Sequence, residues 1–560
     1  MNSYKVISCG TIIVLLLSSV MFLSLDCLVD GQLTSKWYAF VLLSCMGGLL
    51  TLFDRNYKIA VDKIGLMLTL LLLYLLIRGV LAEIPVIEIA VLISLSVLYL
   101  FFQQQVVPAR VIDFLCLGIS LLAAGYGLLQ YILVLPTGQE FRILGSYGNP
   151  SGLAANLAFS FPFLLVFIQR YKVLSACCAL ILLLTVVLTE SRAGLLSITV
   201  VSGIWCFHNF PAKFKPYKKY IGAGMILVSV LFCGYLFLLK QDSAIGRTLI
   251  WKISGNLIAD HFLFGGGSYG FHKEYMLYQA EYFARYPESS CKLLADNMMH
   301  SFNEYLMLTV RYGICALLMA SYTWMLLIRK TQWCSPYLLS IISIGIFSLF
   351  SYPFQYPLTG VVLMYCMVQI AKESRSIAII SGSWSRLATF SLICIAAYLL
   401  IKDIRFEYKW NRVAERSFAG ETGKMLPAYE ALHRSWNGNH MFLYNYAAEL
   451  NHRGWYQQSL EILDGTLNYW NDYDIQMLFS DNHRGSGDWC SAEKHLKLAA
   501  NMCPNRFLPL FYLHDVYVKT HRRDKALHIA HEVVNKEVKI PSSTVSFIKA
   551  QMQEYIEDQD

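Results

Sequence analysis

Long apolar runs separated by short polar gaps fill roughly the first 400 residues of the chain. Thirteen of these runs are about 16 to 22 residues long, enough to cross a hydrocarbon core roughly 30 Å thick as a helix. Their centres lie near residues 15, 45, 72, 95, 120, 160, 181, 200, 230, 315, 344, 364 and 393. The pattern predicts an all-α polytopic membrane protein, with N-terminal transmembrane helices in residues 1–109 and a transmembrane core in residues 110–401.

Composition agrees with this prediction. The 560-residue chain is 56% hydrophobic and only 15% charged, which is too apolar for an ordinary soluble enzyme of this length. The long polar interruption at residues 241–300 therefore stands out, and we expect the chemistry of the protein to lie there.

Basic residues are distributed unevenly among the gaps. Counting from the N-terminus, the even-numbered gaps contain Arg55, Lys58, Lys63, Arg110, Arg170, Lys172, Lys213, Lys215, Lys218, Lys219, Arg329, Lys330, Lys372, Arg375 and Arg386. The short odd-numbered gaps contain only Lys36, Arg78, Arg142 and Arg192. The positive-inside rule then predicts a cytoplasmic N-terminus, with the 241–300 loop and everything after residue 401 outside. The net charge of +8 is explained by topology and does not indicate nucleic acid.

Cysteine usage gives no metal signal. Most of the 15 cysteines lie inside apolar runs, where they behave as small hydrophobes, and the sequence has neither a CxxC motif nor metal-ligand spacing. We therefore predict no metal site and no cofactor. A disulfide among the outward Cys291, Cys490 and Cys503 stays open.

Three outward arginines are candidates for binding an anion. Arg142 precedes a glycine-rich turn that ends in Asn149-Pro150, with Ser151 as the expected helix cap, and a helix N-terminus beside an arginine suits an anion. A simple re-entry turn is the alternative. Arg192 lies at the outer boundary, where an ionisable residue is costly unless it is paired, here with Glu190, or functional.

The 241–300 loop supplies the third arginine, Arg247, together with a glycine run. Gly265 and Gly267 would let the backbone approach a ligand closely, although a glycine run alone is weak evidence.

A histidine in the same loop is the candidate base. His261, His272 and His300 are available, and only His300 lies at the start of an apolar run. Its spacing to Asn303 predicts that both side chains share one helix face, and a neutral imidazole is a natural proton acceptor at neutral pH. An interfacial polar residue without catalytic function is the alternative for His300.

Taken together, these motifs resemble the O-antigen ligase and polymerase superfamily of bacterial envelope glycosyltransferases. The resemblance covers roughly residues 110–370 and comprises Arg142, Gly145, Asn149-Pro150, Asn156, Ser191-Arg192-Ala193-Gly194, Gly246-Arg247, Trp251, Gly265, Gly267, His300, Asn303-Glu304-Tyr305-Leu306 and Tyr312-Gly313. No single motif is decisive. The order of the motifs, their spacing and their predicted side of the membrane together make the resemblance specific.

The resemblance implies a metal-independent, GT-C-like enzyme whose donor is a glycan on undecaprenyl diphosphate. It implies that Arg192 and Arg247 hold the diphosphate, with Arg142 as a further contact, and that His300 activates an acceptor hydroxyl. Many relatives have a second polar residue just after the histidine, whereas this chain has Ser301-Phe302.

The last part of the chain, residues 402–560, is soluble in character and repetitive. Ser459, Ala492 and Ala526 recur at intervals of 33 and 34 residues in similar contexts, and Pro504 and Pro541 close two of the units. Such a period resembles tetratricopeptide helix pairs, which usually bind protein. A purely structural appendage is the alternative.

The sequence therefore predicts an envelope glycosyltransferase of the bacterial inner membrane, with a periplasmic helical repeat domain. Its expected partners are the lipid-linked donor, membrane lipids and a protein bound by the repeats. The acceptor is open: lipid A core would make the enzyme a ligase, another glycan a polymerase, and a protein an O-oligosaccharyltransferase. A flippase or exporter of lipid-linked glycans is the alternative from another class, but it would place charge along the helices.

Overall fold

The protein is described from a computed structural model that covers residues 3–54, 57–137, 141–168, 170–209, 241–373, 375–435 and 438–559, with residues 217, 220, 224 and 234. The chain divides into two compact units. Unit 1 comprises Met1–Leu239, Phe302–Leu308 and Ile314–Tyr408, and unit 2 comprises Lys240–Ser301, Thr309–Gly313 and Lys409–Asp560. The predicted helix near residue 230 and the basic residues Arg55, Lys213, Lys215, Lys218 and Lys219 lie outside the described residues.

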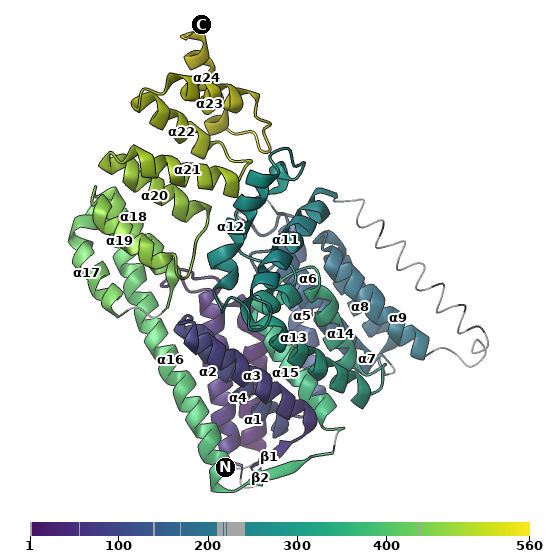
Figure 1. The fold of residues 1–560 in the computed structure, drawn as a ribbon. Coiled ribbons are helices and arrows are strands. Elements are labelled where there is room, and N and C mark those ends of the chain that lie inside the picture. The colour runs from purple at the N-terminus through teal and green to yellow at the C-terminus, as the bar shows by residue number, and fades with distance from the viewer. Residues whose placement is uncertain are drawn as a thin grey trace. The chain divides into compact units, whose positions relative to one another are not determined.

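Unit 1 is built of apolar helices (Figure 1). They are α1 (Ser3–Ser19), α2 (Thr34–Leu52), α3 (Lys63–Leu81), α4 (Val86–Gln103), α5 (Ala109–Tyr131), α6 (Pro150–Ser160), α7 (Leu164–Phe167), α8 (Lys172–Leu188), α9 (Arg192–His208), α14 (Pro336–Ser348) and α15 (Pro357–Ala371), with short turns η1 (Val20–Phe22), η2 (Phe161–Phe163) and η5 (Pro353–Gln355). Helices α13 (Glu304–Lys330) and α16 (Ser383–Arg416) contribute to both units.

The predicted fold class is confirmed. Apart from the run near residue 230, every predicted centre falls in an apolar helix, and seven helical spans among the described residues are long and apolar enough to cross a membrane. Unit 1 packs α2 on α4, α4 on α15, α15 on α14 and α14 on α9. Its interior is filled by buried aromatic side chains such as Phe101, Phe159 and Tyr365.

A two-stranded antiparallel sheet in unit 1 departs from the helical pattern. Strand β1 (Lys58–Val61) pairs with β2 (Ala378–Ser381), with Lys58 opposite Ser381. The Gln103 side chain extends the pairing, because its amide donates to the Ala60 carbonyl at 2.6 Å and accepts from the Ala60 N–H at 3.2 Å. Strands of four residues carry too little periodicity to be predicted from sequence.

The turn before α6 differs from the prediction in one detail. Asn149, not Ser151, is the N-cap: its side-chain oxygen accepts from the Ser151 N–H at 2.7 Å. Pro150 is the first helical residue, where its missing N–H costs nothing.

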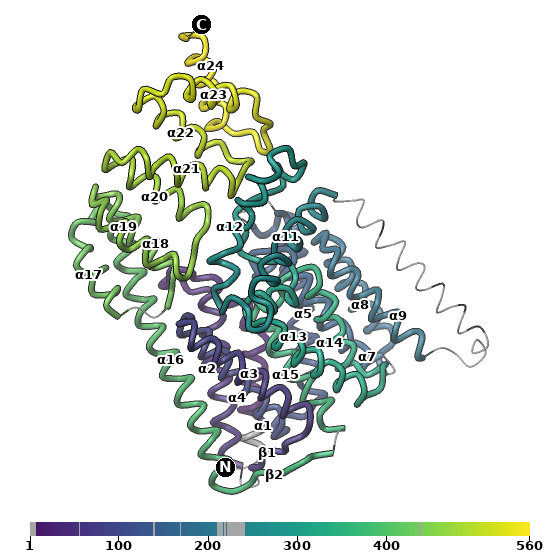
Figure 2. Tube along the Cα trace, viewed as in Figure 1, coloured from purple at the N-terminus to yellow at the C-terminus, as the bar shows by residue number. Residues whose placement is uncertain are grey.

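Unit 2 is also helical. Its elements are α11 (Gln241–Asp260), α12 (Gly270–Arg285), η4 (Lys292–Leu294), η6 (Ser417–Glu421), α17 (Thr422–Arg434), α18 (His440–His452), α19 (Tyr456–Thr466), α20 (Tyr473–Ser486), α21 (Trp489–Met502), α22 (Leu508–Lys519), α23 (Arg523–Asn535) and α24 (Ser543–Glu557). From α17 onward each helix packs on the next, so the trace folds back and forth (Figure 2). Helix α12 packs on α21, which joins the loop after residue 240 to the C-terminal helices.

The 33–34-residue period corresponds to successive helix pairs. Ser459, Ala492 and Ala526 lie on α19, α21 and α23, the second helix of each pair, and all three are fully buried. The Ser459 hydroxyl donates to the Ala447 carbonyl of α18 at 2.7 Å, which shows how close the two helices come. A small side chain is needed at that position. The assignment to the tetratricopeptide class stays a prediction, as do the predicted domain boundaries.

Two glycines of unit 2 meet at a break in α13. Gly313 interrupts the helix with φ 74° and ψ −178°, and Gly265 has φ 69°. A Cβ on Gly265 would lie 2.6 Å from backbone atoms of residues 311–313, and the Gly266 N–H donates to the Val310 carbonyl at 2.9 Å. Only glycine combines these backbone angles with so close an approach.

We expect Gly265→Ala to lower the free energy of unfolding by about 2 kcal/mol or more, because alanine adds left-handed strain and backbone overlap. Thermal unfolding of the purified full chain in detergent would measure the effect. Gly255→Ala is the matched control: Gly255 lies in α11 with open space around it, so alanine should raise stability by about 0.4–1 kcal/mol. Equal melting temperatures for the two variants would contradict the close approach.

Candidate active site

The candidate base His300 lies in a segment without regular secondary structure, residues 295–303. Two side chains from α11 and α12 hold backbone carbonyls of this segment. Gln279 donates to the Asp296 carbonyl at 3.0 Å, and the Trp251 indole donates to the Ser301 carbonyl at 3.1 Å. The chain is therefore held both before and after His300.

His272 is itself held by the C-terminal helices. Its backbone carbonyl accepts from the Asn471 N–H at 3.1 Å, and its ring lies 5.9 Å, centroid to centroid, from the ring of His440. His440 in turn packs on Tyr269 and Trp470 at 5.6 and 5.2 Å. His440, the first residue of α18, thus packs against the ring of His272.

The environment of His300 keeps its imidazole neutral. Burial, with the positive charge of Arg311 as the second cause, lowers the pKa of His300 from 6.5 to about 4. The same effects act on His272, whose pKa is held well below 6.5 by burial and by His440, Arg311 and His300. At neutral pH the His300 imidazole is therefore uncharged, so it can accept a proton but cannot act as an imidazolium acid.

Arg311 is the functional candidate that the sequence interpretation missed. It lies in α13 two residues before the break at Gly313 and contacts the ring of Tyr312 at 5.5 Å. A charged residue within an apolar run is by itself a signal for function, and this signal could have identified Arg311.

Arg247 lies on α11, four residues before Trp251, so the two side chains share one face of the helix. Trp251 uses that face to contact the Ser301 carbonyl. Gly246, the residue before Arg247, lies close to η4, because a Cβ on Gly246 would be 3.9 Å from Leu294. Arg247 is partly buried within the same unit as His300.

The prediction that His300 and Asn303 share a helix face is wrong. Helix α13 begins at Glu304, and Asn303 is its N-cap with extended backbone angles. The Asn303 side-chain oxygen accepts from the N–H groups of Tyr305 and Leu306 at 3.0 and 3.1 Å. Asn303 therefore starts the helix that follows His300, and Phe302 between them has φ 51°, which turns the chain sharply.

Arg192 and Arg142 belong to unit 1. Arg192 is the first residue of α9, after the cap Ser191, whose hydroxyl accepts from the Gly194 N–H at 3.3 Å. It therefore combines a guanidinium with a helix N-terminus, as an anion site requires. Arg142 is exposed and precedes the turn at Gly145, whose N–H is held by the Gln130 side chain at 2.7 Å.

The predicted supporting glycines have structural contacts within the protein. Gly265 approaches the backbone of α13, as described above, and Gly267 has φ 84° and lies buried just before α12, its carbonyl accepting from the Gly270 N–H. Among the described cysteines, Cys291, Cys490 and Cys503 are free thiols. The described residues contain no group of three or more His, Cys, Asp or Glu side chains arranged as metal ligands.

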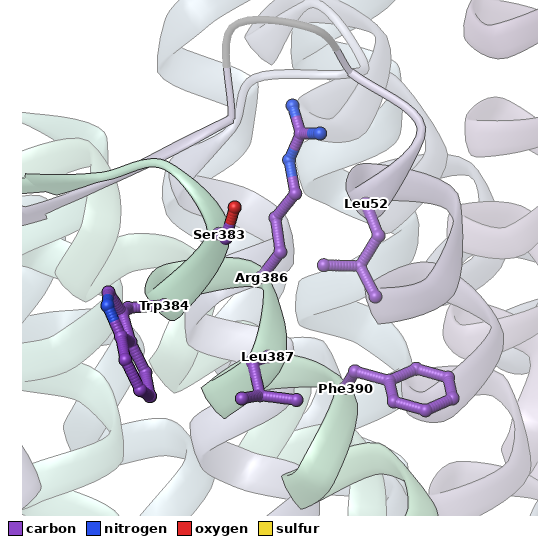
Figure 3. Close-up of a pocket in the computed structure, with 6 residues that line it drawn as sticks. All are labelled: Leu52, Ser383, Trp384, Arg386, Leu387 and Phe390. Atoms are coloured by element: carbon purple, nitrogen blue, oxygen red, sulfur yellow. The ribbon is translucent and has the colours of Figure 1, made fainter.

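Two surface pockets lie away from these residues. In unit 1, a pocket of about 500 Å³ is lined by Leu52, Ser383, Trp384, Arg386, Leu387 and Phe390 (Figure 3). The Arg386 side chain in this lining donates to the Asp54 carbonyl at 2.8 Å. Most of the other lining side chains are apolar. In unit 2, a pocket of about 490 Å³ lies between the turns before α21 and α23 and includes Trp489 and Arg522. Neither pocket contains a predicted site residue.

Fold and site together define a membrane-embedded, α-helical protein with a histidine and arginine centre. Residues 177–321 match the family model Wzy_C, described as O-Antigen ligase. The matched segment includes Arg192, Arg247 and His300, and it ends after Gly313. The chain therefore contains a segment similar to O-antigen ligases, which supports the predicted resemblance to the O-antigen ligase superfamily. No curated protein matches the chain.

The buried histidines make the stability of unit 2 depend on pH. The pKa of His440 is lowered by burial to about 4, so below its ordinary value of 6.5 the unfolded chain takes up a proton that the folded protein resists. The stabilisation is complete above pH 6.5 and is lost as the pH falls toward 4. Between pH 7.5 and pH 5 the loss should be about 2 kcal/mol for this histidine alone.

Melting curves of the full chain at the two pH values would test this. We expect His440→Phe, which keeps an aromatic ring but cannot titrate, to narrow the difference in melting temperature between pH 7.5 and pH 5. The outcome that contradicts the assignment is an unchanged difference in a variant that is folded at both pH values.

Proposed function

We propose that this protein transfers a preassembled glycan from undecaprenyl diphosphate to an acceptor hydroxyl at the periplasmic face of the bacterial inner membrane, as an O-antigen ligase does. The family match supports the reaction class. The observation that carries the proposal is His300: its imidazole is kept neutral, and the Ser301 carbonyl that follows it is held by the Trp251 indole.

In the proposed reaction, the acceptor oxygen attacks the anomeric carbon of the donor while its proton passes to His300. The bond from the anomeric carbon to the diphosphate oxygen breaks, and undecaprenyl diphosphate leaves with the electron pair. No metal or cofactor takes part. The resemblance assigns the diphosphate to Arg192 and Arg247, with Arg142 as a further contact, because guanidinium groups stabilise the charge that develops on the leaving oxygen.

Arg311 gives the base a dependence on the donor. In the free protein, burial and the Arg311 charge hold the pKa of His300 near 4, which makes the imidazole a weak base. A bound diphosphate would offset the Arg311 charge and raise the basicity of His300 when the donor is in place. His300 would then be most basic when the donor is bound, which is the complex in which transfer takes place.

The acceptor decides between three variants of this function. Lipid A core is the acceptor of a ligase, another glycan chain that of a polymerase, and a serine or threonine of a protein that of an O-oligosaccharyltransferase. The helical C-terminal segment favours a protein or a protein-assisted acceptor slightly, whereas the family description favours the ligase.

Buried carboxylates in unit 1 argue against a flippase or exporter, the alternative from another class. Asp113 accepts from the hydroxyls of Tyr365 and Tyr337 at 2.7 and 3.3 Å, and Asp403 accepts from Tyr38 at 2.7 Å. Charges that serve a transport path should face an open pathway, whereas these carboxylates are satisfied by tyrosines within the helix packing.

The decisive test is His300→Ala in the native host, with envelope glycans profiled by gel and mass spectrometry. We expect transfer to fall by a factor of about 100 or more, since a general base contributes about 10² to 10⁴. Glycan should accumulate on undecaprenyl diphosphate, and the acceptor left bare identifies the variant of the function. Single repeat units on their normal acceptor would indicate a polymerase.

His261→Ala is the matched control from the same loop, because His261 pairs with Glu274 at 2.9 Å on the partly exposed side of α12. This variant should retain transfer. Normal glycans in the His300→Ala strain, with the variant present in the membrane, would refute the proposed reaction.

The donor dependence of the base gives a further prediction. The acid limb of kcat/KM reports the free protein and should lie near the low pKa of His300, whereas the acid limb of kcat reports the donor complex and should lie at higher pH. Pre-steady-state and steady-state transfer assays across pH 4 to 8 would measure both. Arg311→Gln should shift the acid limb of kcat/KM to higher pH, because it removes one of the two causes that lower the pKa of His300. Coincident limbs in the wild type would contradict the mechanism.

A further inference from the structure

The turn that follows α11 exposes three large apolar side chains in a row. Phe262, Leu263 and Phe264 are 52%, 56% and 55% exposed, although they belong to the polar loop after residue 240. Contiguous exposed side chains of this kind mark surfaces that bind protein or lipid. We call these three residues the apolar tip.

The backbone of the apolar tip lies against the break in α13. A Cβ on Gly313 would overlap the Leu263 carbonyl and would lie 2.5 Å from the Phe264 nitrogen. Gly265, the next residue along the chain, approaches the same break, and the Gly266 N–H donates to the Val310 carbonyl at 2.9 Å. The apolar tip is therefore held at the level of Gly313 along α13.

The position of Gly313 in α13 gives the depth of the apolar tip. Helix α13 is long and apolar enough to cross a membrane, and its last residues, Arg329 and Lys330, mark one end of the apolar stretch. The helix from Gly313 to Ile328 rises about 23 Å at about 1.5 Å per residue, whereas the hydrocarbon core is roughly 30 Å thick. Gly313 therefore lies about 7 Å inside the opposite boundary of the hydrocarbon, and tilt of the helix would place it deeper.

Polar contacts precede the apolar tip on the chain. Asp260 accepts from the Tyr278 hydroxyl, and His261 pairs with Glu274 at 2.9 Å. The polar groups next to the tip thus bind to side chains of α12, and the apolar side chains follow them directly. Segments that insert about 5–10 Å into the boundary between headgroups and acyl chains combine a polar side and an apolar side in this way.

From these observations we propose that the apolar tip inserts into the membrane beside α13, with the acyl chains of bilayer phospholipids as its partner. The polar loop is then anchored in the membrane at a point that its composition does not indicate. Because the tip continues directly into Gly265 and Gly266, its insertion holds the turn that contains Arg311 at the membrane boundary. The inference does not depend on the proposed function.

Cysteine accessibility in open fragments of native membrane tests the insertion. Leu263→Cys should react at least about tenfold more slowly with a charged, membrane-impermeant maleimide than Gly255→Cys, because hydrocarbon excludes the charged reagent. Gly255 is the matched position, since it lies exposed in α11 with open space around it. Peptide mass spectrometry separates these sites from the native cysteines, and the exposed Cys490 of the same unit is the internal reference. Equal reaction rates at positions 263 and 255 would overturn the proposal.

A carboxylate within the tip gives the opposite result if lipid covers it. With Phe262→Cys as the reporter, Leu263→Asp should raise the labelling rate about tenfold, because a charge is costly in hydrocarbon and draws the tip toward water. Leu263→Met should leave the rate unchanged. Both substitutions replace a side chain that is more than half exposed, so the core of the protein is not disturbed. A reporter that stays equally protected in Leu263→Asp would contradict the insertion.

Photo-cross-linking identifies what covers the tip. The full-length protein with p-benzoylphenylalanine in place of Leu263, irradiated in native membranes, should gain the mass of a phospholipid. The same replacement of Glu288, which is exposed in the turn after α12, should give no lipid adduct. An adduct with another protein or with a polyprenyl diphosphate, or no adduct at position 263, would overturn the assignment to bilayer phospholipid.

Discussion

A segment without helix or strand has to satisfy its backbone hydrogen-bonding groups by other means, and residues 295–303 do so through side chains of α11 and α12. The donors are an indole and a carboxamide, and the carbonyls they hold belong to Ser301 and Asp296. His300 is therefore placed by its neighbours along the chain. This explains how an irregular segment can present a side chain with the precision that catalysis needs.

Unit 2 is assembled from parts of the sequence that lie far apart. The loop after residue 240, the short stretch around Arg311 and the C-terminal helices belong to one compact unit, and α12 packs on α21. Helix pairs bury their small residues against each other, as Ser459 does against Ala447, and leave their turns available for contacts with the loop. Asn471, in the turn before α20, makes such a contact with His272. The turns between these helices thus contact the polar loop within unit 2.

The sequence predicted what depends on local pattern. Apart from the run near residue 230, which lies outside the described residues, apolar length alone located the helices around the centres from residue 15 to residue 393. The 33–34-residue period located the helix pairs through Ser459, Ala492 and Ala526. His300 was selected because it alone of the loop histidines lies at the start of an apolar run, and its role as the base stays a prediction. The missed features depend on contacts between distant residues: β1 pairs with a strand some 320 residues later, and His440 contacts His272, which lies about 170 residues earlier in the chain. Asn303 was assigned to a helix face because hydropathy does not show at which residue a helix is capped. It is the N-cap of α13, and an N-cap residue has an extended backbone.

The break in α13 connects the glycines to the electrostatics of the site. A guanidinium within a spanning helix would carry a large desolvation cost. Gly313 ends the regular helix two residues after Arg311, Gly265 approaches the broken turn, and the Gly266 N–H donates to the Val310 carbonyl. Residues 309–313 consequently belong to the polar unit, where the Arg311 charge acts on His272 and His300. The break at Gly313 and the close approach of Gly265 thus accompany the placement of the Arg311 charge in the same unit as His272 and His300.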